Sequence, residues 1–164
     1  MDSYLSRHPG SYITGDGGYR DSDGYIYVMG RIDDVINVAG HRLSTGEMEE
    51  VLASHPAVAE CAVIGVNDEL KGQVPRGLVV LKAGVNADPG ALSAELVQLI
   101  RDQIGAIAAL RRVDVVAALP KTRSGKILRK TMRGIADGQD EPVPSTIDDP
   151  AVLDALRSVL TDSS

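Results

Sequence analysis

Hydrophobic and polar residues alternate near the start of the chain, where Tyr, Ile and Val are interspersed with Gly and Asp. The segments "SYITGDGG" (11–18) and "DGYIYVMGR" (23–31) follow this two-residue period, and "DSDG" (21–24) is a typical turn sequence. The pattern predicts a β-hairpin. Because an isolated hairpin is only marginally stable in water and no later segment offers an obvious partner, we expect part of the fold to lie upstream.

Two more short strands and a helix are predicted next. The segment "RIDDVINVAGHRL" (31–43) has the Val and Ile content of a strand pair. Ser44 then precedes Glu47 by three positions, which is the spacing of a capping box. A helix is therefore expected over 45–54, stopped by Pro56, with an apolar face formed by Met48, Val51 and Leu52.

The middle of the chain predicts two paired strands followed by a helix. The Val-rich runs "AVAECAVIGV" (57–66) and "GLVVLKA" (77–83) are bounded by Gly and Pro, as strands commonly are. Asp88 and Pro89 have the chemistry of an N-cap and first helical residue. This helix is expected to continue to Gly105, with an apolar face of Leu92, Leu96, Leu99 and Ile100.

The last third predicts one strand and two helices. "RRVDVVAAL" (111–119) is expected to be a strand, and "GKILRKTMRGIAD" (125–137) a helix that ends at Gly138. A Pro-rich polar connector (138–150) leads to a short helix that opens at Asp149 and Pro150. The apolar faces of these helices are Ile127, Leu128, Met132 and Ile135 in the first, and Val152, Leu153, Leu156 and Val159 in the second. This element order predicts an α+β fold, with helices packed on one face of a small mixed sheet.

Composition excludes several classes of protein. The 164 residues are 43% hydrophobic and 24% charged, which is typical of one globular domain with short additions. A net charge of -6 and 3% aromatic residues, all of them Tyr, argue against nucleic-acid binding. Cys61 is the only cysteine, and no apolar run is long enough for a membrane span. We therefore expect a cytoplasmic protein with no nucleic-acid or membrane partner.

The strongest candidate for chemistry is "PKTRSGKILRK" (120–130). It is not a P-loop, because that motif requires Gly where position 120 is Pro and Ser or Thr where position 127 is Ile. One interpretation is a solvated basic loop. The alternative is that Ser124 and Gly125 form a tight turn on a mobile loop and present Lys126 to negative charge developing on a phosphate.

Other candidates are individually weak. Asp16 stands in a Gly-rich turn, where Asp is commonly a turn former, although an ionised carboxylate is also suited to both hydroxyls of a ribose. Arg31 and Arg42 belong to a charged strand pair. The three histidines lack the spacing of a zinc site.

Taken together, five motifs in this order resemble the adenylate-forming acyl-CoA synthetases, in particular the acetyl- and propionyl-CoA synthetases. They are "TGD" (14–16), "GRIDDVINVAGHRLST" (30–45), "HPAVAECAVIG" (55–65), "KGQVP" (71–75) and "LPKTRSGKILR" (119–129). The resemblance covers nearly the whole chain but only about the last quarter of a family member. It implies that residues 1–32 end the large N-terminal AMP-binding domain and leave its hairpin here, that 33–138 form the mobile C-terminal lid, and that 139–164 are a connector and terminal helix.

The resemblance also implies an activity. Family members join a small carboxylic acid to AMP, using ATP and releasing pyrophosphate, and then turn the small domain so that coenzyme A displaces AMP. Lys126 matches the lysine that stabilises charge during adenylation, and in the family this lysine is silenced by acylation. A lysine acyltransferase and a deacylase are thus implied partners, beside the missing N-terminal domain, and this chain alone is expected to be inactive.

Further residues match functional positions of the family. Asp16, Arg31 and Arg42 match contacts to ATP or AMP, and Asp33 matches the hinge residue. Ala39, where many acetate enzymes have Ser, lies with Gly40 and Arg101 at positions near coenzyme A. The carbonyls of Ala53 and Val58, together with His55, match a Mg²⁺ site.

The sequence is also compatible with two alternatives. A freestanding binding module or lysine-acylation target would keep the fold and the "SGK" turn without a partner domain. A nucleic-acid binder would use the basic run at 121–133, although the acidic net charge disfavours it. The acid itself, acetate or propionate, is selected outside this segment.

Overall fold

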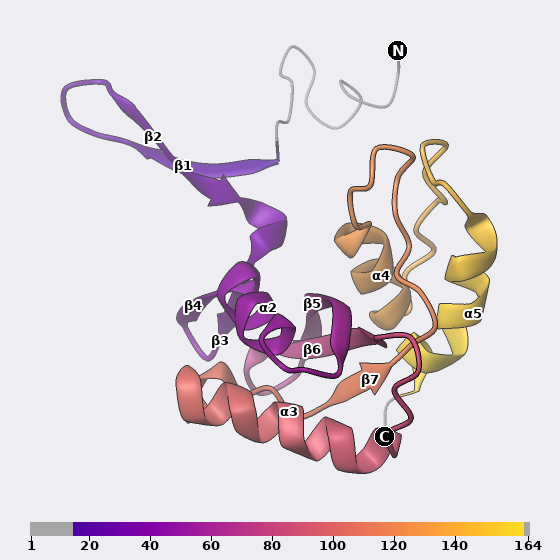
Figure 1. Cartoon of the computed structure of the whole chain (residues 1–164). Coiled ribbons are helices and arrows are strands. Elements are labelled where there is room, and N and C mark those ends of the chain that lie inside the picture. The colour runs from indigo at the N-terminus through magenta and orange to yellow at the C-terminus, as the bar shows by residue number, and fades with distance from the viewer. Residues whose placement is uncertain (1–14, 163–164) are drawn as a thin grey trace. The chain divides into compact units, whose positions relative to one another are not determined.

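The computed structural model describes residues 15–162, which form two compact units divided between Val35 and Ile36. In the first, strands β1 (Asp16–Arg20) and β2 (Ile26–Arg31) form the predicted antiparallel hairpin, seen in Figure 1. Its turn is held by Asp21, whose Oδ1 accepts hydrogen bonds from the backbone N–H groups of Asp23 (3.0 Å) and Tyr25 (2.9 Å). Positions 11–14 of the predicted first strand lie outside the described residues.

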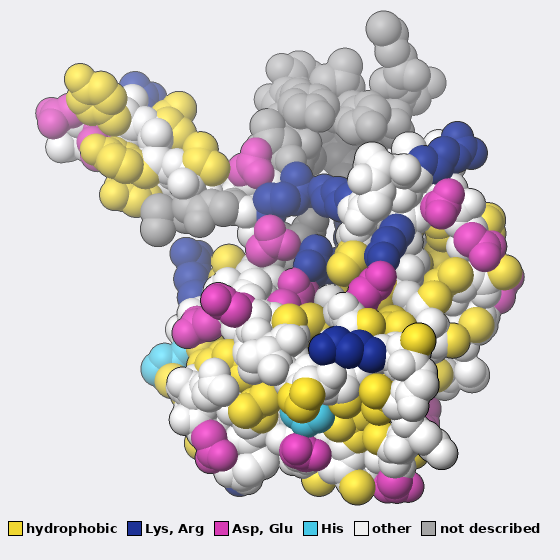
Figure 2. All heavy atoms as spheres, viewed as in Figure 1, with side chains coloured by type: hydrophobic (Ala, Val, Ile, Leu, Met, Phe, Trp, Pro, Cys, Tyr) yellow, Lys and Arg dark blue, Asp and Glu magenta, His cyan; other side chains and the backbone are white. Residues whose placement is uncertain are grey.

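The hairpin carries an exposed hydrophobic surface. Large apolar side chains cover much of it in Figure 2, and the rings of Tyr19 and Tyr27 stack with centroids 4.9 Å apart. Ile26 and Val28 are 74% and 68% exposed. Such a concentration of exposed apolar side chains is characteristic of a surface that packs against another part of a protein.

The second unit is built on a mixed sheet, as the sequence predicts. Its strands are β3 (Val35–Val38), whose first residue Val35 ends the first unit, β4 (His41–Ser44), β5 (Val58–Asp68), β6 (Gly72–Leu81) and β7 (Val113–Val115). The order is β4-β3-β6-β5, with β7 also paired to β6. The long strands β5 and β6 pair antiparallel, whereas β7 runs parallel to β6, which makes the sheet mixed.

Four α-helices in the described residues pack on this sheet: α2 (Thr45–Ala53), α3 (Pro89–Gln103), α4 (Arg129–Ala136) and α5 (Pro150–Thr161). The predicted caps are present. Ser44 Oγ accepts from the N–H of Glu47 at 3.4 Å, and Asp88 Oδ2 accepts from the N–H of Ala91 at 2.8 Å. A short 3₁₀ helix η1 (Ile32–Asp34) precedes β3, and a second, η2 (Ala106–Ala108), follows α3. No helix of the described residues is both long and apolar enough to cross a membrane.

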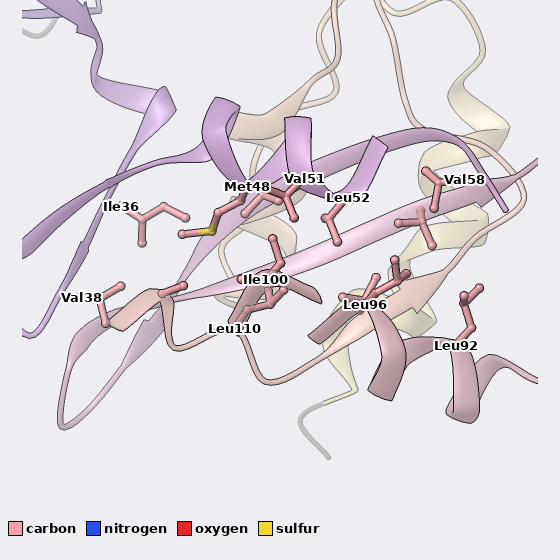
Figure 3. Packing of buried hydrophobic residues seen from close by; sticks show 14 residues of the cluster. Ile36, Val38, Met48, Val51, Leu52, Val58, Leu92, Leu96, Ile100 and Leu110 are labelled. Atoms are coloured by element: carbon pink, nitrogen blue, oxygen red, sulfur yellow. The ribbon is translucent and has the colours of Figure 1, made fainter. Parts of the chain in front are cut away.

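The expectation that the helices cover one face of the sheet is wrong. One core cluster joins α2 and α3 to Val63 and Val79, and part of it is shown in Figure 3. The other joins α4 and α5 to the adjacent residues Ile64 and Leu78. Since neighbouring residues in a strand point to opposite faces, β5 and β6 are covered by helices on both sides.

The predicted helix over 125–137 is also corrected, because α4 begins only at Arg129. Ile127 instead forms an isolated antiparallel bridge with Lys121. The N–H of Leu128 donates to the carbonyl of Pro120 at 2.9 Å, so residues 127 and 128 pair with residues 120 and 121 and are not helical. Gly125 has φ +85°, a left-handed conformation that a helix cannot contain. The predicted stop at Gly138 is observed, with φ +69°.

Candidate functional site

Lys126 lies directly after a tight hairpin turn. The N–H of Gly125 donates to the carbonyl of Thr122 (2.8 Å), and the N–H of Thr122 donates to the carbonyl of Lys126 (2.8 Å). With Gly125 at positive φ, this is the hydrogen-bond pattern of a turn that contains a glycine bulge. The Ser-Gly pair therefore closes a turn, and the side chain of Lys126 is exposed beside it.

The turn is also hydrogen-bonded to the connector that precedes α5. Thr122 forms an isolated bridge with Ile147, which is buried in the core below α4 and α5. The N–H of Arg123 donates to the carbonyl of Thr146 (3.0 Å), and the N–H of Asp148 donates to that of Lys121 (2.9 Å). The backbone around Lys126 is thus held by hydrogen bonds from the hairpin and from the connector.

Two cations of the same basic run, Lys121 and Arg129, form ion pairs. Lys121 Nζ lies 2.6 Å from Glu60 Oε2, and Arg129 contacts both carboxylate oxygens of Glu49. Among the described residues, no carboxylate forms an ion pair with Lys126. Its ammonium group is therefore available to an external anion.

Two of the positions matched to coenzyme A contacts, Ala39 and Gly40, form another tight turn. Ala39 and Gly40 connect β3 and β4 with φ of 48° and 86°, which is the signature of a hairpin turn that favours Asn or Gly at both positions. The N–H of Ala39 donates to the carbonyl of Lys71 at 2.8 Å, which ties this turn to the β5–β6 connection. Arg42 is exposed on β4, and Arg101 is exposed in the last turn of α3. In Figure 1 the β3–β4 hairpin lies apart from the segment that leads into α4.

The remaining nucleotide positions belong to the hairpin unit. Asp16 and Arg31 are directly opposite each other in the β1–β2 register. The Arg31 guanidinium also lies close to Gly15, because a Cβ at that glycine would be 3.3 Å from Arg31 Nη2. Asp33, the matched hinge residue, lies within η1.

The side chain of His55 does not fit the matched Mg²⁺ site. Its Nδ1 accepts a hydrogen bond from the N–H of Ala57 (3.2 Å), and its Nε2 lies 3.1 Å from Glu95 Oε1. In the neutral ring, Nε2 then carries the proton, so neither nitrogen offers a lone pair to a metal. Mg²⁺ also prefers an octahedron of oxygen ligands. Within residues 15–162, no group of three His, Cys, Asp or Glu side chains is arranged to hold a metal ion.

The segment that ends at Lys126 matches a known family. Residues 47–126, from the first turn of α2 to the exposed lysine, match the AMP-binding enzyme C-terminal domain. This segment of the chain belongs to that family. The matched residues include most of α2, all of α3, the strands β5 to β7 and the turn before Lys126.

Similarity extends over nearly the whole chain. It is 64% identical over 162 residues to an uncharacterized protein of Pseudomonas aeruginosa, covering 98% of this chain and 26% of that protein. It is 50% identical to mouse acyl-CoA synthetase short-chain family member 3, mitochondrial (96% and 23% covered), and 49% identical to acetyl-coenzyme A synthetase of Penicillium chrysogenum (95% and 23%). The chain therefore spans about a quarter of the length of these relatives.

Solved structures show the same fold. A crystal structure of Brucella canis acyl-CoA synthetase matches with a TM-score of 0.60 and 41% identity, over 79% of this chain and 24% of that one. ATP-bound MatB from Rhodopseudomonas palustris matches with a TM-score of 0.62 and 28% identity, over 77% and 24%. The predicted resemblance to the C-terminal portion of acyl-CoA synthetases is confirmed, and so is the α+β fold class.

Sequence reasoning missed two residues that support the Lys126 turn. Thr122 is not among the candidates from the sequence, although its hydroxyl accepts a hydrogen bond from the N–H of Lys126. Glu49 was not singled out, although it pairs with Arg129 near the start of α4. The position of Thr122 four residues before the lysine was the available signal for the first. For the second the sequence offers no local signal.

Proposed function

We propose that this chain is the C-terminal domain of a short-chain acyl-CoA synthetase that converts acetate or propionate, ATP and coenzyme A to acyl-CoA, AMP and pyrophosphate. The observation that carries the proposal is the exposed Lys126 on a pinned turn at the end of the matched family segment. An exposed ammonium group on a turn held by backbone hydrogen bonds, with no ion pair to it among the described residues, is suited to the charge that develops on phosphate and carboxylate oxygens during adenylation. ATP and coenzyme A are its co-substrates in this proposal.

The other matched residues take supporting roles in the proposal. Asp16 and Arg31 bind the ribose and the nucleotide, and Arg42 contacts a phosphate. Ala39, Gly40 and Arg101 face coenzyme A after the domain turns about Asp33. Because Ala39 has no hydroxyl, any contact from this position is made by its backbone. No step is assigned to Mg²⁺ at His55.

The chain is proposed to be inactive alone, with the acid pocket in an N-terminal domain that packs against the exposed face of the β1–β2 hairpin. The exposure of Lys126 also supports its proposed acylation by a lysine acyltransferase and reversal by a deacylase, because acylation removes the charge that adenylation needs. The proposed location is the cytoplasm, because Cys61 is a single free cysteine, although the mouse relative is named as a mitochondrial protein.

Substitution of Lys126 by Ala in the full-length synthetase tests the proposal. We expect loss of acid-dependent pyrophosphate exchange, while supplied acyl adenylate and coenzyme A still give thioester. Lys130→Ala is the matched control, because Lys130 is an exposed lysine of the same basic run. Equal loss of both half-reactions, or equal loss in the Lys130 variant, would contradict the role of Lys126.

A further inference from the structure

The backbone of Lys126 has an unusual hydrogen-bond requirement. In the bulged turn, Gly125 and Lys126 both lie opposite Thr122, and the N–H of Gly125 already takes the Thr122 carbonyl. The Lys126 N–H is therefore left without a carbonyl partner in this hairpin. It donates instead to the side chain of Thr122, whose Oγ1 lies 3.1 Å away.

Thr122 is itself held in place from two directions. Its backbone bridges to the buried Ile147 on one side and pairs with Lys126 on the other. Its hydroxyl also lies 2.9 Å from Ser124 Oγ across the turn. Because Thr is branched at Cβ, few χ1 rotamers are open to it, so the position of Oγ1 follows from the backbone.

We propose that Thr122 is a positioning residue for adenylation, whose hydroxyl fixes the backbone of Lys126 and so sets the direction in which the lysine leaves the hairpin. The proposal rests on the function assigned to Lys126 above. A hydroxyl that closes the bulge excludes turn conformations in which the ammonium group points away from the reacting phosphate. Catalysis is sensitive to this, because small misplacements of a charged group lower the rate.

The experiment compares three variants of the full-length synthetase. Thr122→Val keeps the shape and the Cβ branch but removes the hydroxyl, whereas Thr122→Ser keeps the hydroxyl. Ser124→Ala removes the neighbouring hydroxyl without touching the Lys126 N–H. Each variant is measured for kcat and KM in acid-dependent pyrophosphate exchange, and for thioester formation from supplied acyl adenylate and coenzyme A.

Thr122→Val is expected to lower kcat for adenylation roughly three- to tenfold, the range for loss of one hydrogen bond, with KM for ATP and the thioester step unchanged. Thr122→Ser and Ser124→Ala should stay within about twofold of the parent protein. A normal rate in Thr122→Val, equal losses in the Val and Ser variants, or equal loss of both half-reactions would overturn the proposal.

The Lys126→Ala variant separates this proposal from the function on which it rests. If that variant abolishes exchange while Thr122→Val has the parent rate, only the positioning role fails. If Lys126→Ala keeps full exchange activity, both proposals fail.

Discussion

Arg129 and Glu49, 80 residues apart in sequence, form a two-pronged ion pair. Arg129 Nε lies 2.9 Å from Glu49 Oε1, and Nη2 lies 2.7 Å from Oε2. Oε1 also accepts the N–H of Val63 on β5 at 2.8 Å. The side chains are only 22% and 16% exposed, so the pair joins α2, β5 and the start of α4 in a partly desolvated setting.

We predict that Glu49→Gln lowers the free energy of unfolding by about 2 kcal/mol, because it removes the charge of the carboxylate that both prongs of a partly buried guanidinium contact. Urea denaturation of the chain measures the change. Glu60→Gln is the control, since it removes the more exposed ion pair to Lys121 and should change stability by less than about 0.5 kcal/mol. Equal changes in the free energy of unfolding in the two variants would show that the partial burial of the Glu49 pair does not increase its contribution to stability.

The elements that sequence predicted best were those defined by local chemistry. The helix starts at Ser44 and Asp88 are set by side chains that bond within three residues, and both caps are observed. Coverage of both faces of the sheet was missed because a short apolar run identifies a strand without showing what lies on each side. The late start of α4 was missed because Ile127 is held by Lys121 in a bridge that no periodicity reveals.

The candidate site likewise has one part that the sequence predicts and another that only the tertiary structure reveals. The position of Lys126 follows from a short motif. The hydrogen bond from the Lys126 N–H to the Thr122 hydroxyl arises only because of the bulge at Gly125, which leaves this N–H without a carbonyl partner in the hairpin. The pair of Glu49 and Arg129 depends on the tertiary packing of two helices on either side of β5, so no spacing along the chain encodes it.

A second prediction concerns Arg76, a buried arginine on the central strand β6. Its Nε donates to Asp114 Oδ2 (2.8 Å), Nη1 to the carbonyl of Leu160 (2.9 Å) and Nη2 to that of Val159 (2.5 Å). It therefore satisfies backbone carbonyls at the C-terminal end of α5, which a helix leaves without intrahelical partners.

Arg76→Met is expected to destabilise the second unit by about 3 kcal/mol, since it leaves Asp114 buried with one partner fewer and removes the donors to α5. Hydrogen exchange of the α5 amides should accelerate more than exchange of the α3 amides. Arg157→Met, on the same helix but in an exposed pair with Asp154 at 3.6 Å, is the control and should leave both measurements unchanged. Uniform acceleration across both helices would argue against a specific anchor for α5.

The last prediction concerns the thiol of Cys61, which donates to the carbonyl of Glu49 at 3.2 Å. Its pKa is raised from 9.0 to about 11: burial is the largest cause, the Glu49 carboxylate also raises it, and the Arg129 guanidinium lowers it. The pKa of this thiol is higher in the folded chain than in the unfolded chain. Its contribution to the free energy of unfolding is therefore fully present below pH 9 and is lost as the pH rises toward about 11.

We therefore expect iodoacetamide to alkylate Cys61 slowly at pH 8 in the folded chain and faster in urea, with the folded rate rising up to about pH 11. Glu49→Gln should shift this profile to lower pH, because it removes the carboxylate that raises the pKa and leaves Arg129, which lowers it. Glu60→Gln should leave the profile in place. A folded profile that coincides with that of the unfolded chain would refute both the burial of the thiol and its coupling to Glu49.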